Sequence, residues 1–214
     1  MTAGFAAQLR LRAAEEAIAV PPELLDKLSI YYQLLQRWNR KLNLTSLSDP
    51  DQAVDRLVLE PLAAARHLPH GARLVDLGSG GGSPAIPLAL ALNTAALLMI
   101  ESRTRKAAFL REAAREVGLS ATVEAARFEE VAHRSSSAGA FDLASVRAVR
   151  VDHTALESAA ALLRQGGLVA LFRGAAGPDR PEIVGHNLSW RETRPLLRSS
   201  GTRLTLLFHV EQSI

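Results

Sequence analysis

Apolar residues recur at helical spacing through the first third of the chain, which predicts α-helices there. Two adjacent prolines divide this region, and the second of them suits the first turn of a new helix. The pattern predicts a short amphipathic helix within residues 1–20, centred on Phe5, Leu9 and Leu11, a second helix over 22–42 and a third over about 51–67.

From residue 73 onward the pattern changes to short apolar runs that alternate with helical stretches. Such alternation predicts a mostly parallel, twisted sheet with helices on both faces. Gly166 and Gly167 are expected to turn the chain into one of the strands. The predicted strands are 73–77, 96–100, 121–125, 141–146, 168–172, 188–193 and 203–209. Three helices are predicted between them: one that begins near residue 85, one over 103–117 and one over 152–163.

A chain of 214 residues is long enough for one large α/β domain with an additional helical segment. We therefore expect an N-terminal helical extension over residues 1–68, followed by one compact unit over residues 69–214. The predicted fold class is α/β, of the doubly wound, Rossmann-like kind.

The composition excludes several kinds of protein. No cysteine is present, so disulfides, thiolate metal sites and a thiol nucleophile are excluded. No run approaches the roughly 18 uncharged apolar residues that a membrane span needs, and the charged residues near the N-terminus are unlike a signal peptide. We therefore expect a cytoplasmic protein with no membrane contact. The six histidines show no metal-ligand spacing, so we expect no metal.

The most informative segment is residues 75–84, V-D-L-G-S-G-G-G-S-P, between a predicted strand and a predicted helix. Glycines at such a place let the backbone turn sharply and approach a ligand closely. Gly78, Gly80 and Gly82 fit the spacing G-x-G-x-G, whereas the dinucleotide spacing G-x-G-x-x-G would need glycine at Ser83. A P-loop is excluded because no Gly-Lys-Ser/Thr follows.

Two acidic residues indicate which cofactor the loop would hold. Asp76 precedes the glycines, where a carboxylate would repel a pyrophosphate but attract the amino group of a methionine moiety. Glu101 ends the second strand, where an acid accepts the ribose hydroxyls of an adenosine. Together they favour S-adenosylmethionine over NAD. A Rossmann-type NAD(P) oxidoreductase, a cofactor-binding module without activity and a glycine-rich turn without a ligand remain as alternatives.

The catalytic residues that this chain lacks limit which atom of a substrate it could methylate. Methylation of a pyrimidine carbon needs a thiolate, which this chain lacks, and methylation of an adenine amine commonly uses Asn/Asp-Pro-Pro-aromatic after the fourth strand. Residues 145–150 read S-V-R-A-V-R instead. Guanine N7 carries an in-plane lone pair and needs no general base. Arg147 and Arg150 suit a phosphate, a guanine edge or the cofactor carboxylate, and ordinary surface arginines are the alternative.

Several motifs resemble those of the RsmG family, also called GidB, whose members methylate guanine N7 in bacterial 16S rRNA. The resemblance extends from about Tyr32 to Leu206, and it departs from the usual family residues at Ser83, Ala85 and Arg173. The matching stretches are W-N-R-K-L-N-L-T at 38–45, R-L-V-L-E-P-L at 56–62, the glycine loop with P-A-I-P-L-A at 84–89, R-K-A-A-F-L at 105–110, R-F-E-E at 127–130 and R-A at 147–148.

The resemblance implies a class I S-adenosylmethionine-dependent methyltransferase acting on a loop in the decoding region of 16S rRNA. The partner would be that rRNA, within the small ribosomal subunit or an assembly intermediate of it. A methyltransferase acting on another RNA, a protein or a small molecule is the alternative. Arg147 and Arg173 would position the substrate without a general base. The predicted cofactor-binding residues are Asp76, Gly78, Gly80, Gly82, Ser83, Glu101, Phe128, Glu129 and Arg147.

All but three of the 25 basic residues are arginine, although the net charge is only +3. Codon bias would explain this, and contact with phosphates and base edges is the functional alternative. An open parallel sheet binds ligands at the carboxyl ends of its strands, so helices docked beside that edge would form one basic face around the cofactor. The predicted RNA-binding residues are Arg37, Arg40, Lys41, Arg105 and Arg173.

Overall fold

The computed structural model describes residues 2–46, 49–134, 136–147, 151–176, 178, 180 and 187–210. Within this part, no helix is long and apolar enough to cross a membrane. The helices are α1 (Thr2–Glu15), α2 (Pro22–Leu42), α3 (Pro50–Val54), the π-helical turn η1 (Asp55–Leu59), α4 (Glu60–Ala65), α5 (Ala85–Leu92), α6 (Thr104–Glu116), α7 (Phe128–Ala132) and α8 (His153–Leu162). The strands are β1 (Arg73–Leu77), β2 (Ala96–Ile100), β3 (Ala121–Glu124), β4 (Phe141–Arg147), β5 (Leu163–Arg173), β6 (Leu188–Pro195) and β7 (Arg203–His209).

The strands form one sheet with the order β3-β2-β1-β4-β5-β7-β6. Strands β1 to β5 pair in parallel, whereas β7 runs antiparallel to both β5 and β6. The order reverses at β1 and β4, the kind of switch point at which ligands bind in open α/β sheets. The predicted fold class, a mostly parallel twisted sheet covered on both faces, is confirmed.

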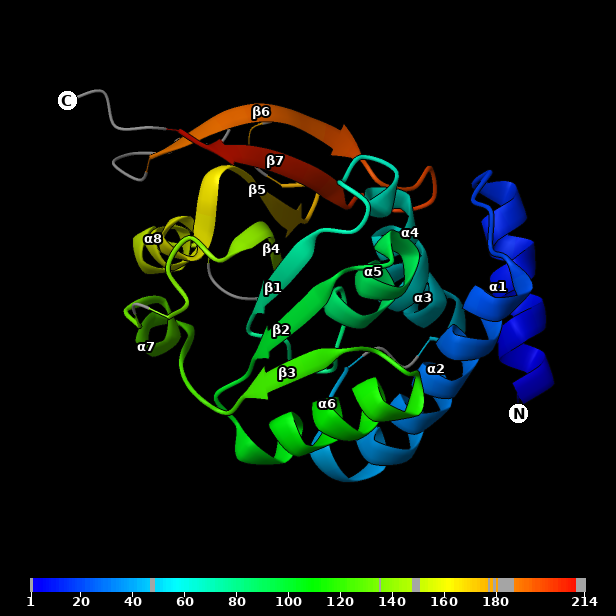
Figure 1. The fold of residues 1–214 in the computed structure, drawn as a ribbon. Helices are drawn as coiled ribbons and strands as arrows, with labels where there is room; N and C mark the ends of the chain where they lie inside the picture. Colours follow the sequence, from blue (N-terminus) through cyan, green and yellow to red (C-terminus); the bar gives the residue numbers. More distant parts are fainter. Residues whose placement is uncertain are drawn as a thin grey trace.

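Helices cover the two faces of the sheet unequally (Figure 1). Side chains alternate along a strand, so Leu74 joins the core beneath α2, α4, α5 and α6, whereas Val75 joins the core beneath α7 and α8. The larger core includes the helices before residue 69. Tyr31 and Leu35 of α2 are fully buried in it, and the ring of Trp38 lies 5.9 Å from that of Phe109 in α6.

The structure differs from the sequence pattern at three places. Leu11 was expected on the apolar side of the first helix but is 63% exposed. The glycines at 166 and 167 do not precede their strand: β5 begins at Leu163, directly after α8, and the glycines lie where its pairing with β4 shifts register. Glycine inside a strand often marks such an irregularity. The five-residue helix α7 was not predicted, because so short an element has no periodic signal.

The third predicted helix is present as one continuous run with a widened turn in its middle. Helix α3 passes into the π-helical turn η1, in which the backbone N–H of Glu60 donates to the carbonyl of Asp55, and then into α4. Apolar periodicity cannot distinguish this turn from a regular α-helix. The turn faces the site described next.

Candidate active site

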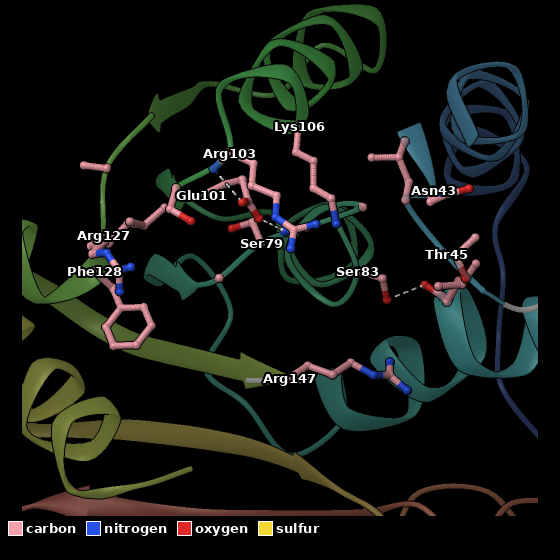
Figure 2. A pocket seen from close by; sticks show the side chains of 18 of the residues that line it. Asn43, Thr45, Ser79, Ser83, Glu101, Arg103, Lys106, Arg127, Phe128 and Arg147 are labelled. Carbon is pink, nitrogen blue, oxygen red and sulfur yellow. Dashed lines mark hydrogen bonds between the residues drawn. The ribbon is translucent and has the colours of Figure 1, made fainter. Parts of the chain in front are cut away.

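A cavity of about 870 Å³ lies at the carboxyl ends of β1, β2 and β4 (Figure 2). Its volume falls within the roughly 300–1,000 Å³ of typical small-molecule sites. Residues 78–81 and Ser83 of the glycine loop line it, and Glu101 and Arg147 lie at the ends of β2 and β4. One further wall comes from outside the sheet, from residues 43–46 after α2 and from Arg56 and Leu57 of η1.

The glycine spacing has a conformational cause. Gly78, Gly80 and Gly82 have φ values of 75°, 51° and 84°, which side-chain-bearing residues rarely adopt. The amides of Gly78 and Ser79 both donate to the carbonyl of Ile100, at 2.9 and 3.0 Å, so the loop is fixed to the end of β2. Gly78 and Gly80 line the cavity.

Gly82 was predicted to contact the cofactor, but it does not line the cavity. A Cβ added there would lie 2.8 Å from Ile86 Cδ1 and 3.3 Å from both Leu110 Cδ2 and Tyr31 Cε2. This glycine therefore lets α2, α5 and α6 approach the loop closely. Gly81, which was not singled out, lines the cavity in its place.

Glu101 connects the glycine loop to the segment that leads into α6. Its Oε2 accepts a hydrogen bond from the Gly80 amide at 2.9 Å, and its Oε1 accepts one from the Arg103 amide at 2.8 Å (Figure 2). The residue is 7% exposed, and each carboxylate oxygen has two lone pairs. Glu101 can therefore accept further hydrogen bonds from a ligand without releasing the loop.

Phe128 and Glu129, which were predicted to bind the cofactor, begin α7 and line the cavity with Glu101. Phe128 offers an apolar ring there (Figure 2). Glu129 Oε2 is buried and accepts no hydrogen bond from any of the described residues. A buried acceptor without a donor is costly, which makes this oxygen a position for a donor group of a ligand.

Asp76 was predicted at the cofactor, but its carboxylate is buried behind the loop and does not line the cavity. Asp76 and Ser145 are register neighbours on β1 and β4, and the Ser145 hydroxyl donates to Asp76 Oδ1. Oδ2 accepts no hydrogen bond within the described part of the chain. Burial raises the pKa of Asp76 to about 6, although the Ser145 hydrogen bond opposes that shift.

Arg147 lines the cavity from the end of β4, where it was predicted. Its guanidinium donates to the Arg56 carbonyl and to Glu60 Oε2, and it lies 5.3 Å from the centre of the Phe172 ring. The Glu60 side chain is completely buried and that of Arg147 is 10% exposed. Burial lowers the pKa of Arg147, and the Glu60 carboxylate opposes this shift.

The N-terminal helices contact the glycine loop directly. The Tyr31 hydroxyl of α2 donates to the Gly81 carbonyl at 2.7 Å, and the Ser83 hydroxyl donates to the Leu57 carbonyl of η1 at 2.9 Å. Ser83, Asn43 and Thr45 lie together on one side of the cavity, across from Phe128 (Figure 2). Ser83, which was predicted to bind the cofactor, thus joins the glycine loop to η1.

None of the predicted RNA-binding residues lines the cavity. Arg37 forms a 2.6 Å ion pair with Glu112 of α6, and Arg40 and Lys41 are exposed at the end of α2. Arg105 is exposed in the first turn of α6. Arg173 was also predicted to position the substrate, but it does not line the cavity: its guanidinium donates to the Pro178 carbonyl at 3.2 Å. Residue 150 lies outside the described residues.

Four cations that sequence reasoning did not single out do line the cavity: Arg56, Arg103, Lys106 and Arg127. Arg103 and Lys106 follow the end of β2, and Arg127 follows the end of β3, so the rule that ligands bind at the carboxyl edge could have identified three of them. Arg56 comes from η1, and no sequence signal places it there. In the described ranges, no group of three or more His, Asp or Glu side chains could hold a metal ion.

Comparisons with known proteins agree with this geometry. The model of the GidB family, described as rRNA small subunit methyltransferase G, matches residues 24–192. The chain is 39% identical over 177 residues to the ribosomal RNA small subunit methyltransferase G of Rhodospirillum centenum, covering 82% of this chain and 78% of that protein. A relative of the same name from Stenotrophomonas maltophilia is 36% identical, with 83% and 80% covered.

The fold also resembles solved structures at low sequence identity. A putative O-methyltransferase from Klebsiella pneumoniae superimposes with a TM-score of 0.62 at 16% identity, covering 96% of this chain and all of that one. MtNAS, solved in complex with S-adenosylmethionine, gives 0.58 at 13% identity, with 98% and 92% covered. These likenesses concern the class I methyltransferase fold. From the family match and the relatives, the chain belongs to the GidB family of small-subunit rRNA methyltransferases G.

Proposed function

We propose that this chain transfers a methyl group from S-adenosylmethionine to N7 of a guanine in 16S rRNA. The observation that carries the proposal is Glu101, whose carboxylate joins the glycine loop to the start of α6 and faces a cavity walled by cations. Membership of the GidB family supports rRNA as the substrate. The cavity supports the cofactor class.

The residues of the cavity fit S-adenosylmethionine. Glu101 would accept the ribose hydroxyls, and Phe128 would contact the adenine ring. Glu129 Oε2, which accepts no hydrogen bond from the described residues, would accept one from a donor of the adenosine. Gly78 and Gly80 would let the methionine moiety approach the backbone. Asp76 would act from behind the loop, where its ionised carboxylate attracts the amino group of the ligand without touching the cavity surface.

When bound, S-adenosylmethionine supplies an electrophilic methyl group on its sulfonium. Guanine N7 attacks with its own lone pair and carries no proton, so no residue has to act as a general base. The protein contributes proximity and alignment, which are large effects for a displacement between two bound partners. Arg147 is the cavity residue whose fixed guanidinium suits this alignment, because it is held at the end of β4 by two acceptors.

The basic residues in and near the cavity indicate where the rRNA would bind. Arg103, Lys106 and Arg127 line the cavity and would contact phosphates next to the target guanine. Arg37, Arg40, Lys41 and Arg105 would extend that surface along α2 and α6. Arg173 would contribute only at the periphery, since its guanidinium already contacts the Pro178 carbonyl. We place the reaction in the cytoplasm, on the small ribosomal subunit or on an intermediate of its assembly.

Methyl transfer to purified substrates tests the proposal. The protein would be incubated with methyl-labelled S-adenosylmethionine and either naked 16S rRNA, assembled small subunits or a subunit precursor, and the product nucleoside identified by mass spectrometry. We expect N7-methylguanosine at one position. Labelling of a different nucleoside, or of a protein or small molecule with no rRNA product, would contradict the proposed acceptor. Binding of NAD but not of S-adenosylhomocysteine would contradict the proposed cofactor.

A further inference from the structure

The π-helical turn η1 and Pro61 deprive two backbone carbonyls of their usual α-helical donors. In a regular α-helix the Glu60 amide would donate to the Arg56 carbonyl, but here it donates to that of Asp55. The next residue, Pro61, has no N–H, so it can donate neither to Arg56, its π-helical partner, nor to Leu57, its α-helical partner. The widened turn and the proline together remove the i+4 donors of both the Arg56 and the Leu57 carbonyl.

Both released carbonyls accept hydrogen bonds from residues that line the cavity. The Arg56 carbonyl accepts from Arg147 Nη1, and the Leu57 carbonyl accepts from the Ser83 hydroxyl at 2.9 Å. Glu60, in the same run, accepts from Arg147 Nη2 through its buried Oε2. π-Helical turns are frequent at functional sites, and this one supplies the contacts for two cavity residues.

The contacts with η1 determine where Arg147 can point. Two of its guanidinium nitrogens are directed at acceptors on η1 and α4, and the Phe172 ring lies 5.3 Å away. A guanidinium has five N–H donors in a rigid plane, so fixing two of its nitrogens fixes the direction of the remaining donors. Without Glu60, the same side chain would keep its charge but lose its fixed orientation.

We propose that the segment from Arg56 to Pro61 is a positioning element for methyl transfer, in which Glu60 and the released carbonyl of Arg56 orient the guanidinium of Arg147 in the cavity. Glu60 is then a positioning residue that acts through Arg147. This inference rests on the proposed function, because it assigns Arg147 to the reacting site.

The same helical run contains a matched control. Asp55, the first residue of η1, is 7% exposed and pairs with Arg12 of α1, whose Nε donates to Asp55 Oδ1 at 3.0 Å. Both carboxylates are buried acids paired with an arginine from another element. Of these two arginines, only Arg147, the partner of Glu60, lines the cavity. Loss of a buried carboxylate's charge as such is therefore common to Glu60→Gln and Asp55→Asn, whereas disturbance of the cavity is specific to Glu60→Gln.

The experiment compares Glu60→Gln, Asp55→Asn, Arg147→Met and the double variant Glu60→Gln/Arg147→Met below their melting temperatures. The readouts are the Kd for S-adenosylhomocysteine and the kcat/KM for rRNA methylation. Misplacement of a catalytic-site group by about 1 Å costs on the order of 100-fold, so we expect Glu60→Gln to lower kcat/KM by roughly 10- to 100-fold. We expect Asp55→Asn to keep it within about threefold, which corresponds to less than 1 kcal/mol.

Non-additivity separates positioning from stability. If Glu60 acts through Arg147, the double variant is no less active than Arg147→Met, and Glu60→Gln changes the same parameter, Kd or kcat/KM, that Arg147→Met changes. The double variant also leaves no unpaired buried charge, so it remains informative if Glu60→Gln alone unfolds.

Three results would overturn the inference, and each differs from the others. Loss of activity in Arg147→Met with full activity in Glu60→Gln would remove the positioning role but leave the proposed site of reaction. Full activity in Arg147→Met would remove Arg147 from that site and the inference with it. Equal losses in Glu60→Gln and Asp55→Asn would assign both carboxylates to stability alone.

Discussion

The hydroxyl of Tyr31 donates a 2.7 Å hydrogen bond to the carbonyl of Gly81, fifty residues further along the chain. Tyr31 is fully buried, and burial raises the pKa of its hydroxyl, so it remains a donor throughout the physiological range. This contact fixes the glycine loop to the accessory helix α2. Replacing the hydroxyl therefore tests whether that helix contributes to ligand binding.

We expect Tyr31→Phe to lower the free energy of unfolding by about 1–3 kcal/mol, because the Gly81 carbonyl loses its buried donor. Ligand affinity should fall as well, since Gly81 lines the cavity. Chemical denaturation and calorimetry with S-adenosylhomocysteine measure the two effects. Tyr32→Phe is the control: Tyr32 is only half-buried on the same helix and does not line the cavity. Equal affinities for both variants would contradict a role of α2 in the cofactor site.

Glu101→Ala should weaken S-adenosylhomocysteine binding by about 1–3 kcal/mol, through unpaired ligand hydroxyls and through loss of the contacts with the Gly80 and Arg103 amides. Glu124→Ala is a matched control, since Glu124 ends the neighbouring strand but pairs with Arg134 away from the cavity. Calorimetry on both variants decides the assignment. It would be wrong if Glu101→Ala bound within about twofold of the parent, a few tenths of a kcal/mol.

Asp76 makes stability depend on pH in a defined window. Its folded pKa of about 6 lies above the ordinary value of 3.8, so the folded state holds the proton more tightly than the unfolded state. This tighter proton binding adds about 3 kcal/mol to the free energy of unfolding below about pH 4. That contribution is lost as the pH rises to about 6. Asp76→Asn should remove this decline, which denaturant unfolding of both proteins across the window would reveal.

The same residue should link ligand binding to pH. A ligand amino group that favours the ionised carboxylate lowers the pKa of Asp76, so affinity for S-adenosylhomocysteine should rise between about pH 5 and pH 7. Calorimetry of the parent and of Asp76→Asn at both pH values measures this link. Parallel pH curves for the two proteins would show that the buried carboxylate does not sense the ligand.

Gly82→Ala should be more destabilising than Gly118→Ala. Both glycines have positive φ, 84° and 68°, so the conformational cost of alanine is similar. An added Cβ would lie 2.8 Å from Ile86 Cδ1 at Gly82, whereas none of the described atoms comes within 4 Å of it at Gly118. We expect a difference of about 1–3 kcal/mol in unfolding free energy, as for overpacked cores. Equal melting temperatures would mean that the core adjusts freely around position 82.

Lys106→Ala should weaken binding of rRNA and reduce the slope of log affinity against log salt concentration by roughly 0.7–0.9, the effect of one lost phosphate contact. Arg115→Ala removes a cation from the far end of the same helix, where Arg115 pairs with Glu116, and should change neither quantity. Arg173→Ala should have an intermediate or smaller effect, because Arg173 lies outside the cavity. Filter binding over a salt series measures the rRNA affinity of the three variants. Equal effects of all three substitutions would indicate a general effect of net charge and not a defined rRNA-binding site.

The sequence by itself determined the sheet, the cofactor loop and the acid that faces it. Those features depend on local signals: apolar periodicity sets the elements, glycine spacing sets the positive φ values, and successive parallel strands bring residues 78 and 101 to one edge. The family resemblance singled out Phe128 and Glu129, and both line the cavity. Local signals did not separate Gly82, which packs in the core, from Gly80, which faces the cavity.

Only the tertiary structure decided which arginines belong to the site and what holds them. Arg147 depends on Glu60, 87 positions earlier, and on a π-helical turn that apolar periodicity cannot reveal. Arg56 faces the cavity, whereas Arg173 contacts a carbonyl outside it. Arginine occurs on solvated surfaces, in ion pairs and at ligand sites, so its presence in a sequence does not indicate which of these it will occupy. The packing of distant segments determines which of these environments each one meets.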